Sequence, residues 1–323
     1  MKRVLITGAS GFVGANLTRR LVELGDEVHA VIRHEHPLWR LESIASDVVT
    51  HDADLVNPEQ IEGVVRKVKP EWIFHLAVYG AYPFQTDVRQ MNTTNIVGTV
   101  NLLEACRREG FERFINTGSS SEYGYKNYAP SEDENPDPNS YYAITKSLAT
   151  TYCSYAAKHF GLPLTTLRLY SAFGPFEEPT RLIPTLVLQG LRGRLPPLVD
   201  PMIARDYVHV EDVVSAYLAT ARCSTTEPGM KLNVGSGTQT DLRTVVECAR
   251  RILDVGEEPQ WGSFPARAWD TSVWVADNRR IKALTGWRPE LTFEQGLMAT
   301  IEWFRQNPEL QQFYRKSNPI LGG

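Results

Sequence analysis

Short apolar runs alternate with longer amphipathic stretches through the first half of the chain. The short runs predict buried parallel strands, and the longer stretches predict the helices that connect and cover them. In chain order, the predicted elements are a strand at 4–6, a helix at 13–24, a strand at 28–32, a helix at 61–68, a strand at 72–76, a helix at 97–108 and a strand at 114–117. Right-handed crossovers then give an α/β fold with a doubly wound parallel sheet, whose ligands bind at the carboxyl ends of the strands.

The pattern changes after residue 170, where prolines become frequent and the regular alternation stops. We expect residues 1–170 to form the sheet domain, with a later segment, about 205–235, returning to it. Residues 171–323 are expected to form mainly a smaller, interleaved C-terminal substrate lobe. Two short apolar segments, 164–169 and 207–210, are candidates to join the main sheet as strands.

The composition and charge of the chain indicate which ligands and which cellular location to expect. The 323 residues are 42% hydrophobic and 22% charged, which is ordinary for a globular protein. A formal net charge of -4 provides no basic field for a nucleic-acid backbone, so an anionic ligand must be met by local arginines. The four cysteines lack metal-ligand spacing, and we expect free thiols and no metal site. With no apolar stretch long enough for a signal peptide or a membrane span, we expect a cytoplasmic location.

A glycine-rich loop separates the first predicted strand from the first predicted helix. Gly8, Gly11 and Gly14 permit a tight turn, let backbone N–H groups approach a pyrophosphate and let the helix pack close to the strand. A strand precedes this loop and a helix follows it, as a Rossmann-type dinucleotide site requires. The predicted cofactor-binding residues of the loop are Gly8, Ser10, Gly11, Phe12, Val13 and Gly14.

The end of the second predicted strand bears on the choice of cofactor. In NAD-binding folds an acidic residue near this point accepts hydrogen bonds from the ribose 2′-hydroxyl. Here the strand ends in Ile32, Arg33 and His34, without a carboxylate, and the Arg33 guanidinium suits a 2′-phosphate. We therefore predict that NADP(H) is favoured over NAD(H). The alternative is that Arg33 is a solvated charge that stacks on the adenine.

A tyrosine and a lysine lie four residues apart at Tyr142 and Lys146. On a helix this spacing places both side chains on one face. A nearby ammonium favours the phenolate and lowers the pKa of the phenol, so Tyr142 is predicted to act as an acid or base.

These motifs together resemble those of the extended short-chain dehydrogenase/reductase family, in its branch of nucleotide-sugar epimerases, dehydratases and reductases. The resemblance covers nearly the whole chain. Besides the glycine loop and YAITK, it rests on Asp54-Leu55, His75-Leu76-Ala77, TNIVGT at 94–99, SSSEYG at 119–124, RDYVHVED at 205–212 and LTGWRP at 284–289.

The resemblance implies a catalytic triad of Ser119, Tyr142 and Lys146, in which Ser119 hydrogen-bonds the reacting sugar oxygen. The structural alternative for Ser119 is that it caps the end of a strand. Further cofactor contacts are implied for Asp54, Leu55, Leu76, Ala77, Thr94, Tyr142, Lys146 and Tyr170. Asp54 could instead cap a turn, and Leu76 and Ala77 could be plain core residues.

The substrate contacts implied by the resemblance are mostly arginines. Arg205 and Arg267 match positions that hold the nucleotide diphosphate, and Asp270 matches one near the nucleoside ribose. Ser120 and Arg181 are further candidates, and a surface salt bridge is the alternative for Arg181.

The residues after Ser119 bear on the reaction. Sugar 4,6-dehydratases of the family resemble one another in an Asp–Glu pair that supplies the acid and base for loss of water. The matching positions here are Ser120 and Ser121, so dehydration is disfavoured. A one-residue shift that makes Glu122 the acid or base is the alternative. The missing strand-end carboxylate and Arg33 favour NADPH-dependent reduction of the C4 ketone of a nucleotide-linked 4-keto-6-deoxyhexose.

Three other expectations remain open. NAD-dependent C4 epimerisation of a nucleotide hexose or uronate is the alternative reaction. A non-catalytic cofactor-binding protein on the same fold is a further alternative. The helices that hold residues 97–108 and Tyr142 resemble those that pair across a dimer axis in this family, so a homodimer is expected.

Overall fold

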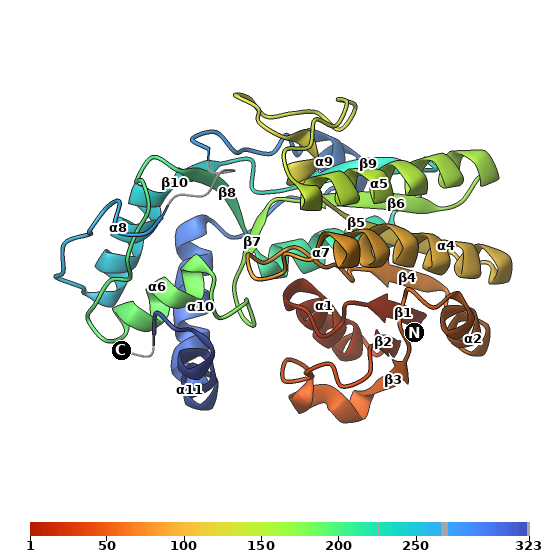
Figure 1. Cartoon of the computed structure of the whole chain (residues 1–323), viewed down its shortest axis with the longest axis horizontal. Coiled ribbons are helices and arrows are strands. Elements are labelled where there is room, and N and C mark those ends of the chain that lie inside the picture. The colour runs from red at the N-terminus through yellow and green to blue at the C-terminus, as the bar shows by residue number, and fades with distance from the viewer. Residues whose placement is uncertain (225–226, 266–270, 322–323) are drawn as a thin grey trace.

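The computed structural model describes residues 1–224, 227–265 and 271–321, and its main sheet is built from the first 170 residues together with one later strand (Figure 1). Within these residues, seven strands pair in parallel in the order β3-β2-β1-β4-β5-β6-β9. Their bounds are β1 Arg3–Thr7, β2 Glu27–Ile32, β3 Val48–Asp52, β4 Trp72–His75, β5 Arg113–Ser119, β6 Leu164–Leu169 and β9 Met230–Val234. The strand order reverses beside β1, which confirms the predicted doubly wound Rossmann-type sheet.

Helices cover both faces of this sheet because its strands are apolar on both sides. Val4 and Ile6 of β1 pack in one core cluster with α1 and α7, whereas Leu5 packs in a second cluster with α2, α4 and α5. The bounds are α1 Phe12–Glu23, α2 Pro58–Val68, α3 Val88–Asn92, α4 Gly98–Glu109, α5 Tyr141–Phe160 and α7 Val210–Arg222. Successive strand residues therefore face opposite layers, as in other parallel sheets with two covered faces.

Local signals set the ends of the helix that carries the Tyr142–Lys146 motif. The Ser140 side chain accepts a hydrogen bond from the backbone N–H of Ala143 at the start of α5, and Gly161 adopts a left-handed conformation at its end. The helix therefore begins just before Tyr142, which places this side chain beside the carboxyl ends of the strands.

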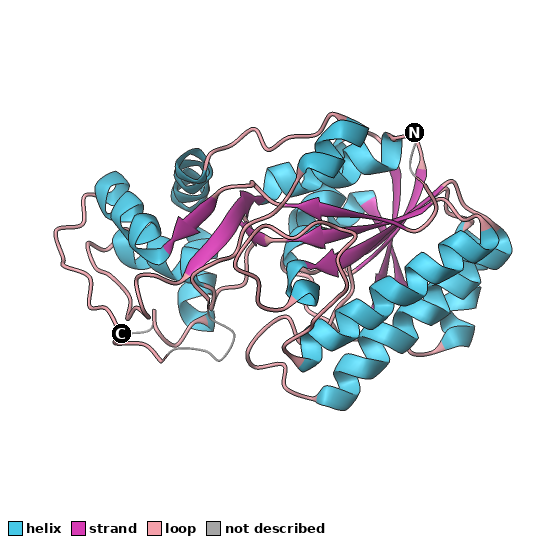
Figure 2. Cartoon of the chain, turned by 90° about the horizontal axis from the view of Figure 1, so that it is seen from above, coloured by secondary structure: helices cyan, strands magenta, loops and turns pink. Residues whose placement is uncertain are grey.

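A smaller second lobe continues from those carboxyl ends (Figure 2). Its sheet has the order β10-β8-β7, in which β8 is antiparallel to β10 and parallel to β7. The bounds of these strands and of the remaining helices are β7 Ser171–Phe173, β8 Ala204–His209, β10 Gln239–Asp241, α6 Leu182–Gly190, α8 Leu242–Leu253, α9 Arg279–Thr285, α10 Phe293–Gln306 and α11 Pro308–Ser317. A third core cluster, from α6, α8, α10 and α11, stabilises the lobe.

The two segments predicted as returning strands have different outcomes. Residues 164–169 form β6 of the main sheet, as predicted. The prediction for 207–210 was wrong, because β8 pairs with β7 and β10 in the second sheet. The position beside β6 is taken by β9, whose Leu232 and Val234 are fully buried there.

No helix among the described residues is both long enough and apolar enough to cross a membrane.

Candidate active site

A cavity of about 1050 Å³ lies at the carboxyl ends of the main-sheet strands, between the sheet and the second lobe. It brings together most of the predicted site residues: Gly8, Ser10, Gly11, Phe12, Val13, Gly14, Arg33, Asp54, Leu55, Leu76, Ala77, Thr94, Ser119, Ser120, Tyr142, Tyr170, Arg181 and Arg205. Lys146 is not part of the cavity wall; it lies buried one turn further along α5. Arg267 and Asp270 lie outside the described residues, so their predicted roles stay predictions.

The glycine loop forms a tight cradle at the start of α1. A Cβ atom at Gly14 would lie 2.0 Å from the carbonyl oxygen of Gly8. Gly8 itself has a φ of +73°, and a Cβ there would lie 2.6 Å from the backbone nitrogen of Ala77. No side chain caps the N-terminus of α1, and its first turn has no acidic residue. The loop therefore fits the pyrophosphate of a dinucleotide, which would meet backbone N–H groups at the positive end of the helix dipole.

The adenosine side of the cavity contains Arg33 and Asp54. Arg33 is exposed just after β2 and, among the described residues, forms no ion pair. The neighbouring carboxylate of Asp52 instead lies 2.9 Å from Nδ1 of His34. One carboxylate oxygen of Asp54 accepts a hydrogen bond from the backbone N–H of Val56, so the residue caps a turn as well as lining the cavity. The guanidinium of Arg33 is thus free of carboxylate partners in the described part of the chain.

Ser119 and Tyr142 form the polar centre of the cavity. Ser119 ends β5 and caps the short turn Ser120–Tyr123, and its hydroxyl lies 2.7 Å from that of Ser121. Burial raises the pKa of the Tyr142 phenol to about 12, and a hydrogen bond with Ser119 opposes this shift. Ser119 therefore serves both as a cap and as a partner of the candidate acid or base.

The electrostatics of this centre differ from the sequence prediction. We predicted that Lys146 would lower the pKa of Tyr142, yet burial dominates and raises it. Burial also lowers the pKa of the Lys146 ammonium, and the negative charge of Glu122 opposes that shift. At neutral pH the phenol of Tyr142 consequently holds its proton and can donate it.

Glu122 does not take the catalytic position that a one-residue shift would give it. Its side chain is fully buried, and Oε2 accepts a hydrogen bond from Nε of Arg168 at 2.9 Å. The other oxygen accepts hydrogen bonds from the backbone N–H of Ser119 and the hydroxyl of Thr150. Both its oxygens are bound in the core, and the turn after Ser119 presents Ser120 and Ser121 to the cavity.

Several cavity residues were not found by the sequence reasoning. Trp274 lines the cavity, and its indole Nε1 donates a hydrogen bond to Oγ of Ser120 at 3.1 Å. Its ring also stands edge-on to Tyr170, and the guanidinium of Arg205 lies 5.7 Å from it. A single tryptophan in a loop carries no local signal of its partners in the sequence.

Arg181 meets a buried carboxyl group on the other wall. Its Nε lies 3.8 Å from Oε1 of Glu177, which also lines the cavity. Burial raises the pKa of Glu177 to about 8. Arg181 therefore lies in the cavity wall and contacts a buried carboxyl group, rather than the surface partner that the alternative supposed.

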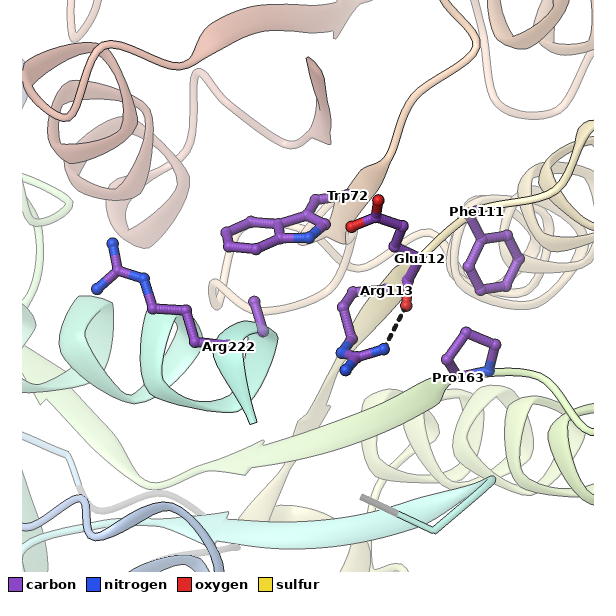
Figure 3. Close-up of a pocket in the computed structure, with 7 residues that line it drawn as sticks. Trp72, Phe111, Glu112, Arg113, Pro163 and Arg222 are labelled. Atoms are coloured by element: carbon purple, nitrogen blue, oxygen red, sulfur yellow. Dashed lines mark hydrogen bonds between the residues drawn. The ribbon is translucent and has the colours of Figure 1, made fainter. Parts of the chain in front are cut away.

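A second, smaller cleft lies at the opposite ends of the strands (Figure 3). Its volume is about 500 Å³, and it is lined by Trp72, Phe111, Glu112, Arg113, Pro163, Ala221 and Arg222. Arg113 there donates hydrogen bonds to the backbone carbonyls of Glu112 and Cys223. It contains none of the predicted site residues that the structure describes, which all belong to the larger cavity or its surroundings. In an open parallel sheet the ligand site forms at the carboxyl ends of the strands, whereas this cleft lies at their amino ends.

Comparison with known proteins agrees with this geometry. The profile of the NAD dependent epimerase/dehydratase family matches residues 4–235. A UDP-glucose 4-epimerase of Mycolicibacterium smegmatis is 30% identical, over 95% of this chain and 100% of that protein. A GDP-6-deoxy-D-mannose reductase of Pseudomonas aeruginosa is 29% identical, over 94% of this chain and 97% of that protein. The solved UDP-glucose 4-epimerase of Thermus thermophilus in complex with NAD superimposes with a TM-score of 0.83 at 27% identity, covering 94% of this chain and 98% of that one. The chain therefore belongs to the NAD dependent epimerase/dehydratase family, within the nucleotide-sugar branch of the extended short-chain dehydrogenases/reductases.

Proposed function

We propose that this enzyme is a nicotinamide-dependent C4 epimerase of a nucleotide-linked hexose or hexuronate. The observation that carries the proposal is the Ser119–Tyr142 pair in a cavity whose neighbouring carboxylate, Glu122, is turned into the core. Such a pair can move one proton to and from a sugar oxygen, which suits interconversion of an alcohol and a ketone. Elimination of water needs a further acid and base, which Ser120 and Ser121 do not supply.

Each residue has a distinct part in this reaction. The cofactor, held at the glycine loop that begins α1, would supply reversible hydride transfer at C4. The positive charge of an oxidised nicotinamide bound nearby would lower the pKa of Tyr142, so that its phenolate would take the proton of the C4 hydroxyl as the ketone forms. The phenol would give this proton back when the alcohol is restored, with Ser119 holding the oxygen. Return of the hydride to the other face of the ketone inverts C4. The cavity wall supplies Arg181 and Arg205 for the diphosphate, and Arg267 and Asp270 are proposed as further nucleotide contacts.

The relatives are the reason for choosing epimerisation over the reduction that the sequence reasoning favoured. The Mycolicibacterium relative matches along its whole length, and it is a UDP-glucose 4-epimerase. Reduction of a C4 ketone is retained as the second candidate, because Arg33 suits NADPH and the Pseudomonas relative is a reductase. The same triad serves either reaction, so the two differ in whether reduced cofactor is consumed.

One experiment separates the two candidates. Purified protein is incubated with UDP-glucose or UDP-glucuronate and a trace of NAD or NADP, and the sugar products are resolved by NMR. In parallel, reduced-nicotinamide absorbance is followed with nucleotide-linked 4-keto-6-deoxyhexoses. Formation of the C4 epimer without net cofactor consumption supports the proposal. Stoichiometric loss of NADPH with a keto sugar, and no epimer, would replace it by the reductase.

The cofactor preference is a separate prediction. We expect Arg33→Ala to weaken NADP binding by about ten- to a hundredfold, because a charge-assisted contact with the 2′-phosphate is lost. Binding of NAD, which lacks that phosphate, should change little and serves as the internal control. Titration of both cofactors into both proteins by calorimetry measures the effect. Equal affinity of the unaltered protein for NAD and NADP would contradict this role of Arg33.

We also propose a homodimer formed through the outer face of α5. Apolar side chains at helical spacing are exposed there: Tyr141, Ile144, Leu148 and Tyr155. An apolar stripe of this kind is typical of helices that pair across a two-fold axis. Sedimentation should give the mass of two chains, and Leu148→Glu should shift it toward one. A monomeric unaltered protein at micromolar concentration would contradict the proposal.

A further inference from the structure

Glu122 connects the turn that begins at Ser119 with the helix that carries Tyr142 and Lys146. Its Oε1 accepts the backbone N–H of Ser119 at 2.8 Å and the hydroxyl of Thr150 at 3.0 Å. Thr150 lies on α5, one turn beyond Lys146. One carboxylate oxygen thus joins the end of β5 to the catalytic helix.

The opposite oxygen of Glu122 is held by Arg168 of β6. The Nε–Oε2 distance is 2.9 Å, and the side chains of Arg168 and Glu122 are 1% and 0% exposed. The guanidinium also stacks over the ring of Tyr123 at 4.5 Å. The carboxylate can move little, because it is bound on both oxygens and enclosed.

The backbone of β5 passes close to the Glu122 carboxylate at Gly118. A Cβ at Gly118 would lie 2.6 Å from Oε1 of Glu122. The strand therefore carries a glycine immediately before Ser119, where the buried carboxylate passes across it. This close approach is what lets a group in the core reach the backbone of a cavity residue.

We propose that Glu122 is a positioning residue for the reaction: it fixes Ser119, at the end of β5, relative to the catalytic helix α5. This deepens the proposed function, since it concerns the triad, but it holds for epimerisation and reduction alike. Glu122 acts through Ser119, Tyr142 and Lys146 and does not itself touch the cavity.

The charge of Glu122 acts in the same direction on both titrating groups. It raises the pKa of Lys146 against the larger effect of burial, and it adds to the burial that raises the pKa of Tyr142. Removing this charge therefore lowers the pKa of both groups. Other ionisable groups also interact electrostatically with Glu122, Tyr142 or Lys146. Apart from Arg168, they are His75, Tyr82, Cys153, Arg181, Tyr217 and Lys231. They remain unchanged in the variants below.

The first test removes the charge and keeps the shape. Glu122→Gln alone would leave Arg168 buried and unpaired, so it is combined with Arg168→Met, which leaves neither ion alone. In this double variant we expect both limbs of the pH profile of kcat/KM to move to lower pH by about half a unit or more. As the pH is raised, Lys146 of the double variant should lose its proton at a lower pH than in the unaltered protein. We therefore expect the affinity for NAD or NADP to begin to fall at a lower pH as well, because the positive charge of Lys146 no longer attracts the anionic cofactor. Unshifted limbs and an unshifted binding profile in a folded double variant would overturn the assignment of the charge.

The second test removes a hydrogen bond and keeps the charge. Thr150→Val deletes the hydroxyl that joins Glu122 to α5 in a side chain of nearly the same shape. We expect kcat to fall by about three- to tenfold, with KM, the pH limbs and the thermal midpoint nearly unchanged. A normal kcat would overturn the positioning role. Cofactor affinity does not depend on which sugar reaction occurs. Failure of the proposed function is seen as an absent epimer, whereas failure of this inference is seen as an unshifted pH profile of cofactor binding, so the two are distinguishable.

Discussion

Tyr142→Phe is expected to lower turnover by about a hundred- to ten thousandfold while cofactor affinity stays within a few fold. The phenol is the group that gives a proton to the sugar oxygen or takes one from it, and phenylalanine preserves the ring that lines the cavity. Steady-state kinetics and cofactor titration on the same preparation measure the two quantities. Lys146→Ala should reduce both, because its ammonium is expected to reach the nicotinamide ribose.

The matched control for Tyr142→Phe is Tyr152→Phe on the same helix. The Tyr152 hydroxyl donates to Glu104 on α4, and the residue is not part of the cavity wall. Removing that hydroxyl should leave turnover unchanged. A near-normal kcat in Tyr142→Phe with cofactor bound would show that the proton passes through another group.

The sequence predicted the main sheet well because most of its strands are buried on both faces and so appear as apolar runs. β3 was missed for the opposite reason: it is an edge strand, and of its five residues only Val48 and His51 are buried. β8 was placed in the wrong sheet. Its buried residues alternate with partly exposed ones, and nothing in such a segment indicates which sheet it joins.

The site was predictable where its residues are close in sequence. Tyr142 and Lys146 follow from helical spacing, and the glycine loop follows from its place between a strand and a helix. Glu122 was ambiguous, because only the turn it forms shows that its carboxylate faces the core. Trp274 reaches Ser120 from 154 residues away, a proximity that no local pattern contains.

The sequence-derived electrostatics failed at Tyr142 for a physical reason. Spacing shows that a lysine is near, but it does not show how deeply the phenol is buried. Two of the groups that act electrostatically on the phenol, Tyr82 and Arg181, also come from segments distant in sequence. The structure gives desolvation as the largest influence on the pKa of both Tyr142 and Lys146. Proximity in sequence therefore predicted the direction of the pKa shift of Tyr142 wrongly.

Gly14→Ala is expected to reduce cofactor affinity by about a hundredfold or more. The added Cβ would lie 2.0 Å from the carbonyl oxygen of Gly8, so either the loop or the start of α1 must move. The neighbour is backbone and cannot rotate away, and its displacement changes the N–H groups that would hold the pyrophosphate. The thermal midpoint should also fall, because α1 packs on the sheet through Leu17 and Leu21.

The chain provides a matched control in Gly63, which lies inside α2; apart from its sequence neighbours and the backbone of its own helix, no described atom lies within 4 Å of a Cβ built there. Gly63→Ala should leave cofactor binding unchanged and raise stability by about 0.5–1 kcal/mol, since alanine is the better helix former. Gly11→Ala, whose Cβ would lie 3.2 Å from the same Gly8 oxygen, should weaken binding less than Gly14→Ala. This order of effects follows from the depth of each overlap alone. Unaltered NAD and NADP affinity in Gly14→Ala would mean that the cofactor does not bind at this loop.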